Sequence, residues 1–184
     1  MAVTAQMVKE LREATGAGMM DCKKALTEAD GNMERAVDIL REKGLSKAAK
    51  KADRVAAEGL VTIKTNADNT VAAIVEVNSE TDFVAKNQDF KDFVADVAEM
   101  VLEGDVADVE ALLASNHKEG KALKDVLNDR VATIGEKLDV RRFERIATSG
   151  KVAGYIHGGG KIGVVVELAT DSNDERVLTL GKDI

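Results

Sequence analysis

The sequence has 184 residues and a net charge of −7, from 26 Lys and Arg against 33 Asp and Glu. Hydrophobic residues make up 45%, which is enough for a packed core and excludes a disordered chain. The acidic balance makes a nucleic-acid binder unexpected, and no apolar run approaches the ~20 residues of a membrane helix. One cysteine and two distant histidines cannot form a structural zinc site, so we expect no metal and a soluble protein of the reducing cytoplasm.

Residues 1–45 predict a bundle of three short helices. Thr4 can cap the first helix, whose apolar residues recur at helical spacing, and two similar stripes of about ten residues follow it. Gly16, Gly31 and Gly44 come after the three stripes and are expected to end the helices. Three amphipathic helices joined by short loops bury their apolar faces against one another.

Residues 46–57 predict a basic connector helix that begins at Ser46. Six Lys and Arg stand against two acidic residues between positions 41 and 54, and large apolar side chains are few. The simplest interpretation is a solvated link between two domains. The other interpretation is a patch that binds RNA or an acidic partner.

From residue 58 the pattern indicates an α+β core. Alternating residues at 61–64, a polar turn and an apolar run at 71–77 predict a β-hairpin whose second strand is central in its sheet. Helical stripes follow, and their helices are expected to cover the sheet. We assign residues 58–138 to the first half of this core.

Residues 139–184 predict a second, truncated half of the core. An extended segment at 140–148 precedes two strands at 152–156 and 162–168, which a turn at 158–160 connects. A helical pattern then continues to the last residue without a stop signal. We therefore expect the sequence to be a fragment of a longer protein.

No catalytic constellation accompanies these elements. His157 precedes three glycines, as in some oxyanion loops, but no serine has the glycine flanks of the matching nucleophile. Lys161 is followed by Ile162, where a phosphate-binding loop needs Ser or Thr. Cys22 occupies a core-type helix position and is expected to be an inert filler. We expect a protein that is not an enzyme and needs no cofactor.

Two places break the local pattern of buried apolar residues. Met19 and Met20 are adjacent in a glycine-flanked loop, and only one of them can readily face a small core. They either cap the open end of the bundle or form a flexible protein-binding surface. Phe83 follows an acidic turn at the start of a helix, where spacing permits either a core residue or an exposed aromatic anchor beside Asp82.

Three stretches resemble the family of bacterial translation elongation factor Ts: Val8–Arg12, Thr15–Leu26 and Thr81–Asn87. The resemblance extends over essentially the whole sequence. It implies an N-terminal bundle like a ubiquitin-associated domain, followed by an α+β core of two related halves with antiparallel β-hairpins covered by helices. The family continues with the rest of the second half, a helical hairpin and a C-terminal module.

The same resemblance implies a guanine nucleotide exchange factor for the GTPase elongation factor Tu in protein synthesis. Such a factor promotes GDP release and binds neither nucleotide nor metal itself. The segment from Thr81 through Asp82 and Phe83 to Val84 corresponds to the family's segment for dislocating Mg²⁺ from the partner. The residues that correspond to partner-binding positions are Arg12, Met19, Met20, Lys23, Ile134, Gly135, His157 and Gly158.

Two other functions stay open from the sequence. An RNA- or ribosome-binding module acting through residues 41–54 would bind with a steep salt dependence. A reader of ubiquitin-like folds acting through the bundle alone would keep its binding after deletion of residues 55–184.

Overall fold

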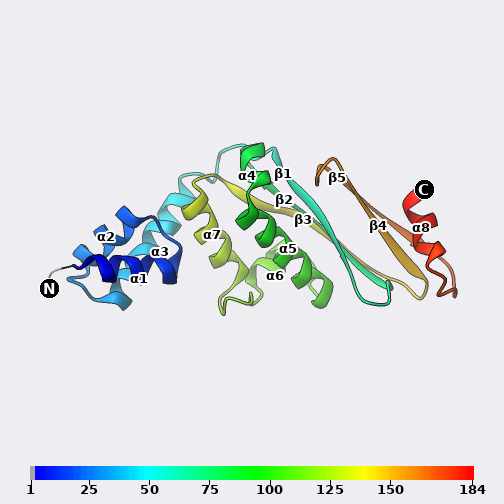
Figure 1. Cartoon of the computed structure of the whole chain (residues 1–184), viewed down its shortest axis with the longest axis horizontal. Helices are drawn as coiled ribbons and strands as arrows, with labels where there is room; N and C mark the ends of the chain where they lie inside the picture. The colour runs from blue at the N-terminus through cyan, green and yellow to red at the C-terminus, as the bar shows by residue number, and fades with distance from the viewer. Residues whose placement is uncertain (1–2) are drawn as a thin grey trace. The chain divides into compact units, whose positions relative to one another are not determined.

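The structure is a computed structural model that describes residues 3–184. The chain divides into two compact units. The first contains the residues up to Arg54 together with Asp125–Lys137, and the second contains Val55–Lys124 together with Leu138–Ile184. Helices and antiparallel strands occur in the order that confirms the predicted α+β class (Figure 1). Within residues 3–184 no helix combines the length and apolarity needed to cross a bilayer.

The predicted three helices at the start of the first unit are confirmed as α1 (Ala5–Thr15), α2 (Met19–Glu28) and α3 (Met33–Ala49). Thr4 caps α1 by accepting a hydrogen bond from the Met7 amide at 3.2 Å. Gly16 ends the helix in the left-handed conformation at a φ of 65°, which glycine adopts at little cost. The apolar stripes meet in a core that includes Leu11, Cys22 and Leu26.

The expected end of the third helix at Gly44 is wrong, because α3 continues through this residue to Ala49. The expected connector helix at 46–57 is wrong as well: Ser46 lies inside α3, and turns follow the helix. Gly44 is buried, and a Cβ placed on it would lie 3.5 Å from Cβ of Ala132 in α7 (Leu123–Ile134). The two helices of the first unit therefore pack together at Gly44 with room for a methyl group but not for a large side chain.

The second unit contains a three-stranded antiparallel sheet. It consists of β1 (Glu58–Thr65), β2 (Val71–Ser79) and β3 (Leu138–Ala147), in the order β1-β2-β3. The prediction that the second strand is central is confirmed, and the strand is apolar because both of its faces are covered. The structure differs from the expected boundary after residue 138, because β3 completes the sheet that the hairpin begins.

Three helices follow the hairpin: α4 (Asp82–Lys86), α5 (Gln88–Glu103) and α6 (Val109–Ala114). The helix α5 packs on β1 and β2 and covers one face of the sheet (Figure 1). Its stripe of buried residues includes Phe90, Phe93 and Val97, at the spacing of one helix face. This layer fixes the end of β2 from which the short helix α4 begins.

The opposite face of the sheet carries a second hairpin, formed by β4 (Lys151–His157) and β5 (Ile162–Leu168). Two glycines allow this packing: Cβ positions built on Gly154 and Gly163 would lie 2.8 Å and 2.5 Å from side chains of β1. The final helix α8 (Arg176–Asp183) packs on the hairpin, and this confirms the helical pattern near the end (Figure 1).

Candidate functional site

The side chain of Phe83 lies on the surface of the second unit. It is 78% exposed, whereas Phe90, seven residues further along the chain, is fully buried under the sheet. Of the two positions that the spacing permits, the structure shows the outward one. An exposed aromatic ring at a fixed place is a feature of protein-binding surfaces, where such rings become buried anchors.

The backbone before Phe83 is tied to the end of β2. Ser79 is fully buried, and its hydroxyl donates a hydrogen bond to the carbonyl of Thr81 at 2.9 Å. Thr81 is extended and precedes the first turn of α4. Ala85 is the buried residue of this short helix, so Phe83 projects from the opposite side.

Asp82 carries a negative charge that two lysines stabilise. Nζ of Lys86 lies 2.6 Å from Oδ2 of Asp82, one helical turn away. The hydrogen bond from Lys86 lowers the pKa of Asp82, and the positive charge of Lys161 lowers it further. The carboxylate is therefore ionised at neutral pH and is held beside the exposed ring.

The turn that contains Gly158 lies at the same end of the second unit. The amide of Val61 donates to the carbonyl of Gly160 at 2.7 Å, so the turn is fixed to β1. Lys161 then forms an ion pair with Glu58, which is opposite Ser79 in the register of β1 and β2. Ser79 lies two residues before Thr81, so the fold brings these two distant segments together. We call Thr81–Val84, His157 and Gly158 the phenylalanine surface.

His157 is exposed and has an ordered neighbour within its own strand. The Tyr155 hydroxyl lies 2.9 Å from Nδ1 of His157, and the two ring centroids are 5.9 Å apart. This contact orients the imidazole at the edge of the phenylalanine surface. The ring can donate or accept a hydrogen bond there, depending on its tautomer.

Met19 and Met20 both point away from the core of the first unit. Their side chains are 59% and 62% exposed, although they occupy the first turn of α2. Cys22 fills the core position of this turn instead. The methionines therefore do not close the end of the bundle, and Arg12 and Lys23 are exposed with them.

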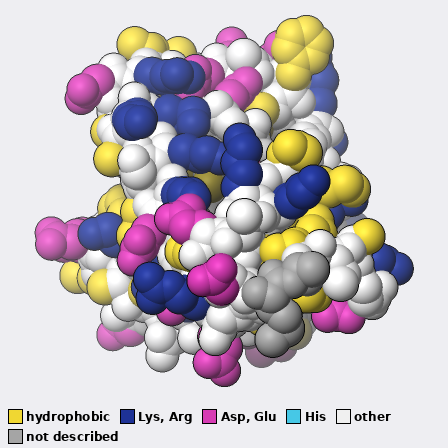
Figure 2. All heavy atoms as spheres, turned by 90° about the vertical axis from the view of Figure 1, so that its left-hand side faces the viewer, with side chains coloured by type: hydrophobic (Ala, Val, Ile, Leu, Met, Phe, Trp, Pro, Cys, Tyr) yellow, Lys and Arg dark blue, Asp and Glu magenta, His cyan; other side chains and the backbone are white. Residues whose placement is uncertain are grey.

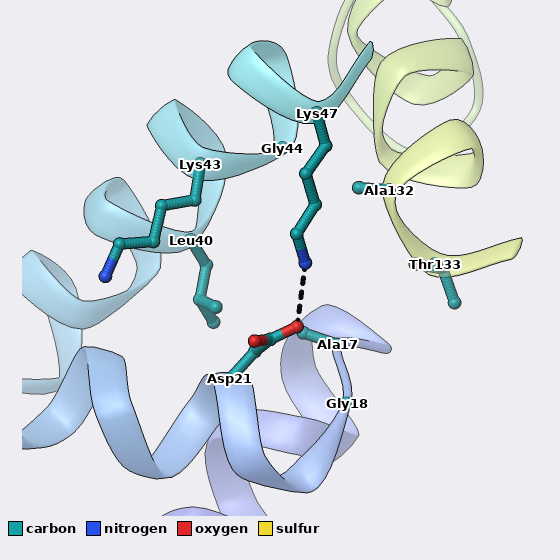
Figure 3. A pocket seen from close by; sticks show the side chains of 9 residues that line it. All are labelled: Ala17, Gly18, Asp21, Leu40, Lys43, Gly44, Lys47, Ala132 and Thr133. Atoms are coloured by element: carbon teal, nitrogen blue, oxygen red, sulfur yellow. Dashed lines mark hydrogen bonds and ion pairs between the residues drawn. The ribbon is translucent and has the colours of Figure 1, made fainter. Parts of the chain in front are cut away.

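A small hollow of about 40 Å³ lies behind the start of α2 (Figure 3). Nζ of Lys47 on α3 lies 2.8 Å from Oδ2 of Asp21 across it, and this hydrogen bond lowers the pKa of Asp21. Ala17 lines one side of the hollow, and Ala132 and Thr133 of α7 line the other. The pair fixes the beginning of α2 to α3.

Ile134 and Gly135 follow directly after the hollow along α7. Gly135 has a φ of 89° and follows the last residue of the helix. Because Thr133 and Ala17 line one hollow, the end of α7 and the loop before α2 belong to one side of the first unit. We give the name methionine surface to the residues of the first unit to which the sequence resemblance points: Arg12, Met19, Met20, Lys23, Ile134 and Gly135.

Basic residues between 41 and 54 are in part neutralised by neighbours. Arg41 pairs with Asp125 at 3.3 Å, Lys43 with Glu28 at 2.5 Å, and Lys47 with Asp21, as described above. On the face that Figure 2 shows, acidic side chains lie beside the lysine and arginine side chains. Three of the six basic side chains of this segment are thus engaged by acidic neighbours, which reduces the positive charge that it offers to a phosphate backbone.

The structure also bears on possible metal ligands and on the thiol of Cys22. Among residues 3–184 no group of three or more His, Cys, Asp or Glu side chains is arranged to hold a metal ion. Cys22 is buried, and desolvation raises the pKa of its thiol, which disfavours the reactive thiolate.

Sequence reasoning overlooked the lysines that support both surfaces. The pair of Asp82 and Lys86 has the spacing of one helical turn, so this signal was present in the sequence. The charge of Lys161 acts on Asp82 only because the second hairpin packs on β1, and Lys47 reaches Asp21 only through the packing of α3 on α2. No local sequence pattern indicates either of these two arrangements.

The chain matches the family model described as Elongation factor TS over residues 80–184. It is similar to proteins named Elongation factor Ts, with 71% identity to the one from Clostridioides difficile and 54% to those from Clostridium novyi and Clostridium perfringens. Each of these matches covers 99% of the chain. The chain spans about 60% of the length of these curated relatives.

Proposed function

Because the chain belongs to the elongation factor Ts family, we propose that it is a guanine nucleotide exchange factor for elongation factor Tu. In this proposal the phenylalanine surface perturbs the Mg²⁺ and phosphate site of the GTPase, and GDP leaves. The methionine surface supplies further contacts to the same partner. The chain itself binds no nucleotide and catalyses no covalent step.

The exposure of Phe83 is the observation that carries this proposal. A ring that is 78% exposed has apolar area to bury against a partner, whereas a core residue has none. The ring starts from a short helix fixed to β2, and the ionised Asp82 is its neighbour. These features suit the insertion of a side chain between elements of the GTPase near its cation.

The physical basis of exchange is thermodynamic linkage. If this chain binds the empty GTPase more tightly than the GDP-bound form, it weakens GDP binding by the same factor. In such GTPases Mg²⁺ bridges phosphate oxygens and neutralises their charge. Moving the ligands of the cation therefore loosens GDP even though the factor does not contact the nucleotide.

The size of the contribution of Phe83 follows from burial. Fully burying a phenylalanine side chain is worth about 1.5–3 kcal/mol, and about 1.4 kcal/mol corresponds to a factor of ten. If the ring is buried only in the nucleotide-free complex, Phe83 supplies roughly a tenfold to hundredfold acceleration. The other contacts of both surfaces supply the rest.

The test is the release of fluorescently labelled GDP from elongation factor Tu, measured by stopped flow with increasing concentrations of this chain. We expect acceleration by the chain, and a loss of roughly tenfold or more of that acceleration in Phe83→Ala. A chain that leaves the GDP release rate unchanged would contradict the exchange function as a whole.

A matched control is Leu180→Ala in α8, which also shortens an exposed apolar side chain, 58% accessible, of the second unit. This variant is expected to keep the full acceleration. If Phe83→Ala and Leu180→Ala behave alike, the insertion of Phe83 is the wrong mechanism even where exchange itself is observed.

Binding of RNA through residues 41–54 is the less supported alternative. Three of its six basic side chains are engaged by acidic residues within the first unit. A measurement of RNA binding over a range of salt concentrations separates the two functions, since phosphate contacts give a steep salt dependence.

A further inference from the structure

The helix α4 that presents Phe83 is too short to hold its shape alone. It has five residues, whereas isolated helices shorter than ~12–15 residues are marginal in water. Ala85 is its buried residue, and the helix packs on β1, β2 and α5 from that side, whereas Phe83 lies on the exposed side. The outward direction of Phe83 therefore needs support from other contacts of this helix.

Lys86 supplies contacts to both residues that the proposed function uses. Its Nζ lies 2.6 Å from Oδ2 of Asp82 and 5.8 Å from the centroid of the Phe83 ring. The second distance is within the ~6 Å over which a cation is attracted to the face of an aromatic ring. One ammonium group thus links the carboxylate and the ring on the surface of a single helical turn.

The pair of Asp82 and Lys86 is also placed in a fixed electrostatic setting. Lys161 contributes positive charge at Asp82, and its own position is set by the ion pair with Glu58 of β1. Lys161 arrives from the second hairpin, so it stays in place when Lys86 is changed. Lys86 is the lysine that contacts the ring itself.

We infer that Lys86 is a positioning residue, which holds Phe83 and Asp82 in the geometry of docking before the partner arrives. The inference rests on the proposed exchange function. An exposed ring and carboxylate that are already ordered lose less conformational freedom on binding, and the complex forms at lower concentration. Once docked, the ring is held by the partner, so the final exchange rate does not depend on Lys86.

The test compares Lys86→Met with Lys86→Arg in the labelled-GDP release experiment. Methionine keeps most of the apolar chain and removes the charge, whereas arginine keeps a cation that can reach both the carboxylate and the ring. We expect Lys86→Met to raise the concentration for half-maximal acceleration by about threefold to tenfold and to leave the maximal rate unchanged. Lys86→Arg is expected to restore most of the affinity.

Lys118→Met is the matched control. Lys118 also pairs with an aspartate at 2.6 Å, its side chain is 69% exposed against 71% for Lys86, and neither Phe83 nor Asp82 is its partner. Lys118→Met should leave both the concentration for half-maximal acceleration and the maximal rate unchanged. If Lys86→Met equals the wild type, if it lowers the maximal rate, or if Lys118→Met has the same effect, the positioning role is overturned.

A second measurement on the chain alone separates this inference from the proposed function. Nuclear magnetic resonance gives the pKa of the Asp82 carboxyl and the mobility of the Phe83 ring without any partner. We expect Lys86→Met to raise the Asp82 pKa toward its ordinary value and to increase the ring mobility. This experiment tests the positioning role even if the wild type fails to accelerate GDP release. If Lys86→Met leaves the Asp82 pKa and the mobility of the Phe83 ring unchanged, the positioning role of Lys86 is overturned.

Discussion

The methionine surface and the phenylalanine surface contain the same kinds of side chains, but these are held in different ways. Each places exposed apolar side chains beside an aspartate that a lysine holds by a hydrogen bond. Lys47 reaches Asp21 from another helix and crosses a hollow in the first unit, whereas Lys86 reaches Asp82 within one turn of one helix. The first pair belongs to the tertiary packing of its unit, and the second belongs to local structure.

This difference predicts how each lysine–aspartate pair contributes to the stability of its unit. Breaking the tertiary pair should loosen the attachment of α2 to α3, and the methionines would lose their support. Breaking the local pair should leave the fold of the second unit intact, because that fold depends on the buried layer between α5 and the sheet. The stability of the fold and the presentation of the proposed binding residues are therefore coupled at the methionine surface and separate at the phenylalanine surface.

The largest effect is expected from the core beneath the phenylalanine surface. Phe90→Ala removes a fully buried ring of α5 and should cost about 3–5 kcal/mol of unfolding free energy. Phe83→Ala removes a ring that is mostly exposed and should change stability by less than about 0.5 kcal/mol. Chemical denaturation followed by circular dichroism compares the two. A cost above about 2 kcal/mol for Phe83→Ala would mean that this ring is a structural residue.

The next effect concerns the support of the methionine surface by α7. Gly44→Leu forces a large side chain between α3 and α7 and should destabilise the first unit by about 1–3 kcal/mol. Gly44→Ala is the control. Its Cβ would meet Ala132 at an ordinary contact distance of 3.5 Å, and alanine favours a helix by up to about 1 kcal/mol over glycine. Thermal melts in which both variants destabilise equally would contradict the packing of Gly44 described here.

The same glycine shows why part of the fold was not predictable. A glycine after an apolar stripe is the usual signal for the end of a helix, and Gly16 and Gly135 obey it with positive φ values. Gly44 gives the same signal but lies inside a helix, because a second helix from much later in the chain packs against it. Only the tertiary neighbour distinguishes the two uses of glycine.

The candidate site divides in a similar way. The apolar run of β2 and the spacing of α5 predicted the sheet and its cover, since these patterns are local. The direction of Phe83 was not predictable, because one spacing fits both a core ring and an exposed ring. The place of Lys161, whose charge acts on Asp82, depends on how the second hairpin packs on β1, and no neighbouring residues encode it.

A smaller effect on stability is expected from replacing Lys47, and none from replacing Lys86. Lys47→Met should lower the stability of the first unit by up to about 1 kcal/mol, the range for a partly exposed ion pair, and Lys86→Met should leave it unchanged. The buried thiol of Cys22, next to Asp21, is the reporter: it is accessible to a thiol reagent only when the bundle opens. We expect faster modification of Cys22 in Lys47→Met only. Equal rates in both variants would show that the tertiary pair does not hold α2.

The smallest effect is the response of the two pairs to acid. The hydrogen bonds from Lys47 and Lys86 lower the pKa of Asp21 and of Asp82 respectively. A carboxyl whose folded pKa lies below its unfolded value of about 3.9 contributes stability above that value, and the contribution is lost as the pH falls through the folded pKa. We expect the first unit to lose the contribution of Asp21 below about pH 4, and Lys47→Met to abolish that loss.

The carboxyl of Asp82, whose side chain is 45% accessible, should titrate in the same pH range, and by the same linkage acid removes its contribution to the stability of the second unit. We expect this contribution to be smaller than that of Asp21, because Lys86 is 71% exposed against 44% for Lys47 and pairs with Asp82 within one helical turn. Carboxyl resonances followed between about pH 2 and pH 6, together with melts of the wild type and both methionine variants, make the comparison. If Lys47→Met keeps the full acid dependence of the first unit, Asp21 is no more tied to the packing of its unit than Asp82 is. The contrast between a tertiary pair and a local pair would then have to be given up, even if both surfaces bind the partner.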